Sequence, residues 1–485
     1  MAMLIGRVKP LDRILVEADN KDRGLKRTLG AVALTAMGIG TIIGTGIFVL
    51  TGIAAATKAG PALTLSFVVA GIVSALAALC YAELASSVPI SGSAYTYAYA
   101  TLGELIAWII GWDLVLEYGV GAATVSIGWS GYLANFLQSA FGIMIPVKWQ
   151  HAPYDLGSGG QIIHGFANLP AACIILLITL LLVKGTRESS IVNTVIVIIK
   201  LSVVLFFLAI GFGHINHANW HPYFPFGWSG VFAGAAFIFF AYIGFDSIST
   251  AAEEAKNPQR DLPLGILLSL TICTVLYIAV VAVLTGIIKY THLSVPSPVS
   301  FAIISLGHLN WAGAIISVGA ICGLTTVLLT LMYGQSRILY AMSRDGLLPQ
   351  VFARLHPAWR TPFVATLTIG VVFAVIAAFT PIGIVTELTN IGTLAAFILT
   401  AVAVIILRRT YPAMKRGFRV PFSPVVPVIS ALASFFLITQ LRPFTWVSFV
   451  IWLLIGLAIY SAYGRTHSAI ALGQPTTPLE SPRVN

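Results

Sequence analysis

Twelve apolar stretches, each able to cross a lipid bilayer, dominate this sequence. A helix that crosses the hydrocarbon core needs about 20 mostly apolar residues, and within lipid only helices and closed barrels satisfy every backbone polar group. The stretches lie at about residues 31–56, 62–87, 105–137, 169–183, 189–212, 229–252, 264–288, 311–340, 363–380, 384–407, 425–440 and 444–463. They predict an all-α polytopic membrane protein with 12 transmembrane helices and both termini on one side.

The composition agrees with a membrane protein. Only 9% of the 485 residues are charged, whereas a soluble domain has about 25%. The four cysteines, Cys80, Cys173, Cys273 and Cys322, lie in apolar stretches and form no Cys-x-x-Cys motif. We therefore expect no disulfide, no metal site and no cofactor. The net charge of +10 is interpreted as topology information, so no nucleic acid partner is expected.

The basic residues predict the orientation, because cytoplasmic segments of membrane proteins are rich in Lys and Arg. With both termini in the cytoplasm, 22 of the 27 basic residues lie in cytoplasmic segments. Four basic residues then face outside: Lys58, Lys148, Lys289 and Arg442. The sequence thus predicts a multi-pass protein of the cell membrane with cytoplasmic termini.

The spans group into one domain with a short segment at each end. The composition of the last residues, rich in Gly, Pro, Thr and Ser, predicts disorder there. The expected parts are a cytoplasmic segment at 1–30, one transporter domain at 31–463 (repeat one 31–212, repeat two 229–407, helices 11–12 425–463) and a cytoplasmic tail at 464–485.

Two spans carry features that an uninterrupted lipid-facing helix would lack. Span 1 contains four glycines within nine residues: Gly38, Gly40, Gly44 and Gly46. Close packing of helices is one explanation, and unwound backbone is the other. Span 6 contains Gly244 followed by an acid. Since spans 1 and 6 run in opposite directions, the paired interruptions predict a five-plus-five inverted repeat with discontinuous helices 1 and 6.

Broken helices expose backbone groups that can bind a small zwitterion. Free N–H groups around Thr45 and Gly46 would bind a carboxylate. Exposed carbonyls near Ile42, Phe240 and Ala241 would bind an ammonium group. The pattern therefore predicts a site for an α-amino acid.

Five stretches of the sequence are similar to a known family. They are Ile43–Phe48, Pro89–Tyr97, Trp112–Tyr118, Gly244–Pro263 and Arg337–Gly346. With them the chain resembles the amino acid–polyamine–organocation superfamily, and most closely the bacterial members of the cationic amino acid transporter family. The resemblance extends from about residue 28 to 463.

The resemblance implies an α-amino acid held where spans 1 and 6 unwind. Thr45 and Gly46 would meet its carboxylate, and Phe240 would close over it from outside. The substrate-binding residues expected in this way are Ile42, Ile43, Gly44, Thr45, Gly46, Phe240, Ala241 and Ile243. The resemblance also associates Lys200 with the position where sodium-coupled relatives hold a cation.

Lys200 lies inside an otherwise apolar span, where an ammonium group costs several kcal/mol unless it is paired, hydrated or deprotonated. A rise of 1.5 Å per residue places Lys200 roughly 18 Å and Glu117 roughly 20 Å from the cytoplasmic ends of their spans. We therefore predict that the two communicate, directly or through water, in proton coupling. The alternatives are an ammonium group that caps unwound carbonyls of span 1, and a Glu117 hydrogen bond between helices.

Other polar residues have simpler interpretations. Asp246 is expected to cap a half-helix of span 6, and a gate is the alternative. Glu387 is expected to stabilise the N-terminus of span 10. The loop at 140–167 is expected to fold over the outer mouth.

The sequence favours proton-coupled uptake of L-amino acids through alternating access, with protons, substrate and lipids as partners. The small apolar residues Ile42, Ile43, Ala241 and Ile243 fit alanine or other small neutral amino acids. A cationic substrate, an exchanger and an amino acid sensor remain alternatives. The sequence does not predict which side chains of span 8, around 322–330, line the site. It also does not predict whether the protein forms an oligomer or binds a small membrane subunit. No motif of a hydrolase, zinc protease or P-loop enzyme occurs, so no enzyme is expected.

Overall fold

The structure is a computed structural model that describes residues 29–87, 95, 98–99, 101–156, 162–185, 190–307, 309–414 and 416–472. Almost all of the predicted N-terminal segment lies outside these residues. So do 473–485 of the predicted tail and most of the Pro89–Tyr97 stretch.

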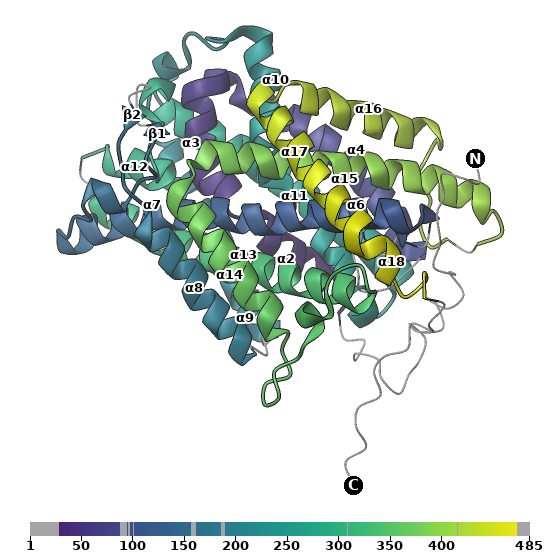
Figure 1. Cartoon of the computed structure of the whole chain (residues 1–485). Helices are drawn as coiled ribbons and strands as arrows, with labels where there is room; N and C mark the ends of the chain where they lie inside the picture. Colours follow the sequence, from purple (N-terminus) through teal and green to yellow (C-terminus); the bar gives the residue numbers. More distant parts are fainter. Residues whose placement is uncertain are drawn as a thin grey trace.

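The described chain is almost entirely helical (Figure 1). Its first half forms α2 (Ala31–Ile42), η1 (Gly46–Leu50), α3 (Thr51–Ala54), η2 (Ala55–Ala59), η3 (Gly60–Ala62), α4 (Leu63–Ser87), α6 (Glu104–Leu114), η4 (Val115–Val120), α7 (Gly121–Phe141), η5 (Val147–Trp149), strands β1 (Asp155–Leu156) and β2 (Ile162–Ile163), α8 (Leu169–Lys184) and α9 (Ser190–Phe212). The η elements are short π- or 3₁₀-helical segments.

The second half begins at the outer loop before span 6. It forms η7 (His217–Trp220), α10 (Gly227–Ile238), η8 (Phe239–Tyr242), η9 (Phe245–Glu254), α11 (Pro258–Ile287), η10 (Tyr290–His292), α12 (Pro298–Ile304), α13 (Asn310–Arg344), η11 (Gln350–Ala353), α14 (Phe363–Phe379), α15 (Ile382–Thr410), α16 (Val425–Thr439), α17 (Pro443–Ile459), η12 (Tyr460–Gly464) and α18 (Arg465–His467).

The helices have the length and composition of a polytopic membrane protein. Within the described residues, eight helical segments are long and apolar enough to cross a membrane, and four shorter apolar helices accompany them. Each predicted apolar stretch falls on one or more of these segments. The predicted membrane fold is confirmed, while the exact count of twelve crossings and the inverted repeat stay predictions.

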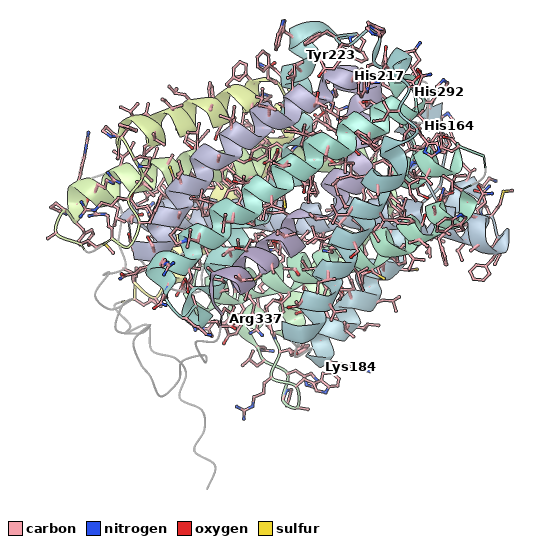
Figure 2. All side chains as sticks on the ribbon, turned by 180° about the vertical axis from the view of Figure 1, so that it is seen from behind. His164, Lys184, His217, Tyr223, His292 and Arg337 are labelled. Atoms are coloured by element: carbon pink, nitrogen blue, oxygen red, sulfur yellow. The ribbon has the colours of Figure 1, made fainter. Side chains whose placement is uncertain are left out.

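The two ends of the helix bundle differ in their side chains. Figure 2 shows His164, His217 and His292 at one end and Lys184 and Arg337 at the other. The three histidines belong to segments predicted outside, and the two basic residues to segments predicted in the cytoplasm. These labelled residues thus lie at opposite ends of the bundle, and which end faces the cytoplasm stays a prediction.

One end is tied by a buried carboxylate on α4. Glu83 is fully buried and accepts hydrogen bonds from Arg408 Nε at 2.8 Å and from the Val420 N–H at 2.7 Å. Arg416 Nε lies 3.4 Å from the same carboxylate. These contacts fasten the segment between α15 and α16 against the end of α4.

Glu387 ties the opposite end, and its predicted role is corrected here. Helix α15 begins at Ile382, so Glu387 lies beyond the first turn. It accepts hydrogen bonds from Arg442 Nε at 2.8 Å and Thr445 Oγ1 at 2.7 Å, and Lys58 Nζ lies 3.9 Å away. The buried carboxylate therefore joins α15, α17 and η2 instead of capping a helix N-terminus.

Candidate substrate site

Span 1 is broken in its middle, as the glycine pattern predicts. Helix α2 ends at Ile42, Ile43 is extended with φ −74° and ψ 101°, and η1 begins at Gly46. Since the last carbonyls of a helix have no partner within it, the break exposes backbone acceptors before it and backbone donors after it. Helix α2 packs among α9, α11 and α13.

Span 6 is broken beside it. Helix α10 passes into η8, Ile243 is extended with ψ 135°, and Gly244 has φ 113° before η9 begins. This left-handed backbone suits glycine, because any Cβ would be strained there. Asp246 follows in the first turn of η9, where the sequence predicts a cap. Helices 1 and 6 are thus both discontinuous.

The two breaks contact each other through a very close approach. A Cβ atom on Gly46 would lie 2.3 Å from both Cα and Cβ of Ala241. The hydroxyl of Thr41 lies 2.9 Å from the carbonyl oxygen of Gly244. Glycine at position 46 is therefore what allows the two unwound segments to meet.

Tyr277 on α11 bridges the two breaks and was not among the predicted site residues. Its hydroxyl lies 2.8 Å from both the Ile42 and the Ala241 carbonyl oxygens. A buried tyrosine hydroxyl usually finds such partners. Two of the carbonyls predicted to bind an ammonium group already accept this hydroxyl. The third, on Phe240, accepts the Ile243 N–H at 3.2 Å.

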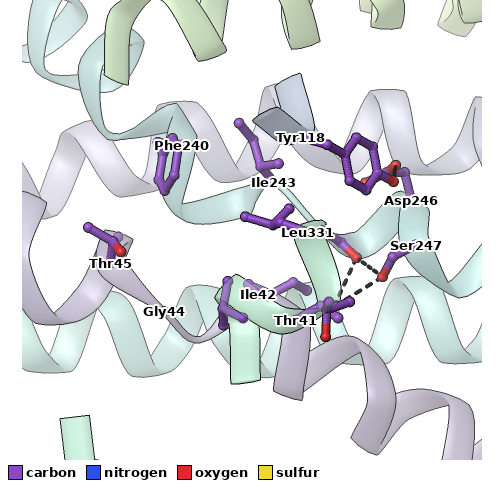
Figure 3. Close-up of a pocket in the computed structure, with 14 residues that line it drawn as sticks. Thr41, Ile42, Gly44, Thr45, Tyr118, Phe240, Ile243, Asp246, Ser247 and Leu331 are labelled. Carbon is purple, nitrogen blue, oxygen red and sulfur yellow. Dashed lines mark hydrogen bonds between the residues drawn. The ribbon is translucent and has the colours of Figure 1, made fainter. Parts of the chain in front are cut away.

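A small cavity of about 30 Å³ lies between the breaks (Figure 3). Its lining is Thr41, Ile42, Gly44, Thr45, Gly46, Tyr118, Phe240, Ile243, Gly244, Asp246, Ser247, Val327, Thr330 and Leu331. Six of the eight predicted substrate-binding residues are among them. The other two, Ile43 and Ala241, are buried outside this lining.

Several lining residues were not predicted. Tyr118 and the polar residues after the break of span 6 belong to this group, and helix α13 supplies Val327, Thr330 and Leu331. Span 8, whose contribution to the lining the sequence did not predict, thus contributes these residues of α13.

The cavity has two polar ends and an apolar middle. At one end the Thr45 hydroxyl is 1% exposed and has no hydrogen-bond partner in the described part of the chain. At the other end the Asp246 carboxylate accepts the Tyr118 hydroxyl at 3.0 Å. Figure 3 shows Thr45 and Asp246 on opposite sides, with Phe240 and Ile243 between them. Such an arrangement suits a small ligand that carries both polar groups and an apolar side chain.

Lys200 lies outside the cavity and caps span 1. Its Nζ donates to the Gly40 carbonyl at 2.6 Å, the residue is 1% exposed, and its aliphatic carbons lie against Gly323. This is the contact that the alternative interpretation of Lys200 predicts, an ammonium group that caps a carbonyl of span 1. The role of Lys200 in proton coupling stays a prediction.

Glu117 lies in η4, 2% exposed, close to Asp113, Asp246 and Thr393. Over the residues that the structure describes, no ion pair joins it to Lys200. The predicted direct contact is therefore not formed here, and communication through water stays a prediction. The neighbouring Asp113 is buried, and among the described residues neither of its carboxylate oxygens has a hydrogen-bond partner.

Known proteins resemble this chain along almost its whole length. The family described as amino acid permease matches residues 29–468. The methylthioribose transporter of Bacillus subtilis (strain 168) is 51% identical over 96% of this chain and 98% of that protein. The branched-chain amino acid permease BcaP of the same organism is 50% identical over 94% of this chain and 97% of that protein.

A more distant relative is the vacuolar cationic amino acid transporter 4 of Arabidopsis thaliana. It is 40% identical over 84% of this chain and 67% of that protein. These matches confirm the superfamily that the sequence motifs resemble. The chain belongs to the amino acid permease family, whose members are multi-pass membrane transporters and not enzymes.

Proposed function

We propose that this protein takes up neutral aliphatic L-amino acids by proton symport across the cell membrane. Both termini lie in the cytoplasm, and lipids surround the spans. The observation that carries the proposal is the Thr45 hydroxyl. It is buried just before η1, has no hydrogen-bond partner in the part of the chain that the structure describes, and lies at one polar end of a cavity with largely apolar walls. Buried polar groups are normally hydrogen-bonded, so this hydroxyl is an empty position for a ligand.

The substrate carboxylate binds at this end. The first N–H groups of a helical segment are free and carry partial positive charge, so those near Thr45 and Gly46 join the hydroxyl as donors. The ammonium group binds the Ile42 and Ala241 carbonyls. Each already accepts Tyr277, but a carbonyl oxygen has two lone pairs, so a second donor can be accepted.

The apolar walls select the side chain. Ile42, Phe240, Ile243, Val327 and Leu331 offer no charge to a substrate. A cavity of about 30 Å³ holds only a few waters, because one water needs about 10–15 Å³ of such space. The site therefore widens when a substrate enters, and its range extends from alanine to branched side chains. The branched-chain relative at 50% identity supports this range.

Lys200 and Glu117 are proposed to couple transport to protons. A charged Lys200 holds the Gly40 carbonyl two residues before the end of α2. Loss of its proton would weaken this bond and release the break. Glu117 is proposed as a second group that can take up a proton. It lies close to Asp246, which lines the cavity. In this form of coupling, the protonation of Lys200 and Glu117 changes the geometry of the site, although neither residue contacts the substrate.

Methylthioribose is a second candidate substrate, since the relative named for it is 51% identical over nearly the full length. This sugar carries neither carboxylate nor ammonium. It would leave the N–H groups at Thr45 without an anionic partner, whereas an amino acid satisfies them. The chemistry of the cavity therefore favours the amino acid.

Uptake into proteoliposomes tests the proposal. Radiolabelled L-leucine and L-alanine are offered with and without an inward proton gradient, with unlabelled methylthioribose or L-arginine as competitor. We expect gradient-driven accumulation of both amino acids. Uptake only into vesicles preloaded with amino acid indicates an exchanger. Competition by methylthioribose or arginine alone reassigns the substrate.

A pair of variants connects the assay to the site. Thr45→Val removes the unpartnered hydroxyl and keeps its shape. Thr51→Val is the matched control, because Thr51 is buried a few residues later and bonds the Ile47 carbonyl of its own helical segment. We expect the first variant to raise the KM for leucine about tenfold and the second to leave it unchanged. Equal KM values in both would contradict the assigned carboxylate position.

A further inference from the structure

A second cavity lies near the outer end of the molecule and has not been assigned a role. It has a volume of about 150 Å³, compared with about 30 Å³ for the central one. Since one water needs about 10–15 Å³ of such space, the second cavity has room for a small organic molecule. It is bounded by η1, α3, α7, the segment before α12 and the hairpin of β1 and β2. Figure 1 shows this hairpin at the same end as α3.

One layer of side chains separates this outer cavity from the central one. Val49 and Gly128 line the outer cavity, and Thr45 lines the central one. A Cβ atom on Gly128 would lie 2.9 Å from Val49 Cγ2 and 3.1 Å from Thr45 Cγ2. The outer cavity is therefore directly adjacent to the carboxylate end of the central site, on the predicted route from outside.

The roof of the outer cavity contains a hydrogen-bonded His–Asp pair. His151 Nδ1 lies 2.9 Å from Asp155 Oδ2, and the two side chains are 14% and 16% exposed. Both residues line the cavity, and Gln150 adds an amide beside them. The floor is apolar, with Val49, Ile53 and Ile127. The partly exposed His–Asp pair thus faces an apolar floor across a space of molecular size.

The roof is held in place by backbone hydrogen bonds. The N–H groups of Phe166 and Ala167 donate to the Lys148 carbonyl at 2.8 and 3.1 Å, and the Gly165 N–H donates to the Ala152 carbonyl at 3.2 Å. At the base, the Asn168 side chain accepts the Ser130 hydroxyl at 2.7 Å. The described backbone on both sides of the His–Asp pair is therefore tied together, from Lys148 and Ala152 to Gly165, Phe166 and Ala167.

The geometry points to an outer docking site for the amino acid, used before the substrate reaches the central site. This inference rests on the proposed amino acid transport. A zwitterion can take over the hydrogen bond between His151 and Asp155. Its ammonium group replaces His151 at the Asp155 carboxylate, and its carboxylate accepts the ring N–H that Asp155 releases. No hydrogen-bonding position is lost in the exchange. The apolar side chain then covers the floor.

A thiol reporter tests this site in the full chain. Ile163 pairs directly with Asp155 across the hairpin and lines the cavity, so the two side chains share a face. Ile163→Cys is made with the exposed Cys173 and Cys322 changed to serine. Its reaction with a membrane-impermeant methanethiosulfonate is followed in proteoliposomes with and without L-leucine.

We expect saturating leucine to slow the reaction about tenfold, and to do so also when Thr45→Val weakens the central site. Asp155→Asn and His151→Gln should each abolish this protection. His164→Gln is the matched control, since His164 is in the same hairpin but does not line the cavity; it should keep the protection. Asp155→Asn should also raise the KM for uptake about tenfold and leave the maximal rate unchanged.

Two results overturn the docking site. In the first, protection disappears with Thr45→Val but persists with Asp155→Asn, which means that the loop only senses occupancy of the central site. In the second, leucine is transported without any protection of Cys at position 163. Protection without transport retains the docking site and refutes the proposed function, and absence of both refutes the two together.

Discussion

The contact between Gly46 and Ala241 leads to a prediction that the structure makes quantitative. Gly46→Ala places a methyl carbon 2.3 Å from the Cα and the Cβ of Ala241. Non-bonded carbons prefer about 3.5 Å or more, so the two broken helices must separate by more than about 1 Å. Because one of the contacted atoms is a backbone carbon, no change of side-chain rotamer relieves the overlap.

The cost should fall on the closed arrangement of the site. Overpacking of this kind costs about 1–3 kcal/mol, equivalent to about a 5- to 150-fold shift of population away from the arrangement in which the breaks touch. Since Gly46 and its neighbours line the cavity, the separated helices no longer hold the substrate. We expect the initial rate of leucine uptake to fall by the same factor.

Gly44→Ala provides the control for an added methyl group in the same break. Its Cβ would lie 3.2 Å from Val327 Cγ2, which is a side-chain atom that can give way. Leucine uptake is measured in proteoliposomes with matched protein content, together with the melting temperature of each purified variant. Wild-type uptake by Gly46→Ala would refute the argument from close approach, as would a melting temperature that falls further with Gly44→Ala than with Gly46→Ala.

Three further predictions follow from the surroundings of the site. Lys200→Met should remove the response of uptake to the inward proton gradient, measured as uptake against external pH; a folded variant with the wild-type response contradicts proton coupling at this residue. Tyr277→Phe removes the one O–H proton that the Ile42 and Ala241 carbonyls share and should destabilise the protein by about 1–3 kcal/mol. Its melting temperature should fall, and an unchanged melting temperature would exclude the bridging role. Tyr118→Phe removes the donor to Asp246, so arginine should inhibit leucine uptake about tenfold better than in the wild type; unchanged inhibition would mean that this carboxylate does not attract cations in the cavity.

The spans and their breaks were predictable because their signals are local. Length and apolarity alone locate a membrane helix, and the predicted 169–183 and 363–380 agree closely with α8 (Leu169–Lys184) and α14 (Phe363–Phe379). The broken helices were also predictable, since glycines and an acid in mid-span conflict with an intact helix in lipid. Six of the predicted site residues line the cavity because they are adjacent to these breaks.

The contributions of other helices were not predictable. A helix that is apolar all round gives no indication of which face meets a cavity, so Val327 and Leu331 of α13 and Tyr277 of α11 could not be selected. Depth is also an incomplete coordinate. The rise per residue places Lys200 and Glu117 at similar heights in the membrane. It does not give the direction in which each side chain points around its helix axis. Lys200 extends to Gly40, while Glu117 is close to Asp246.

The donors around the break explain which end of the substrate the site prefers. A helix interrupted in lipid exposes both carbonyl and N–H groups, and each group left unpaired is costly. Lys200 and Tyr277 supply side-chain donors to the carbonyls of Gly40, Ile42 and Ala241. On the other side of the break, the Thr45 hydroxyl has no partner within the described chain. The carbonyls before the break thus already have side-chain donors, while the Thr45 hydroxyl after it has none among the described residues. Under the proposed function, a carboxylate therefore gains most from binding beside Thr45, and a neutral sugar gains least.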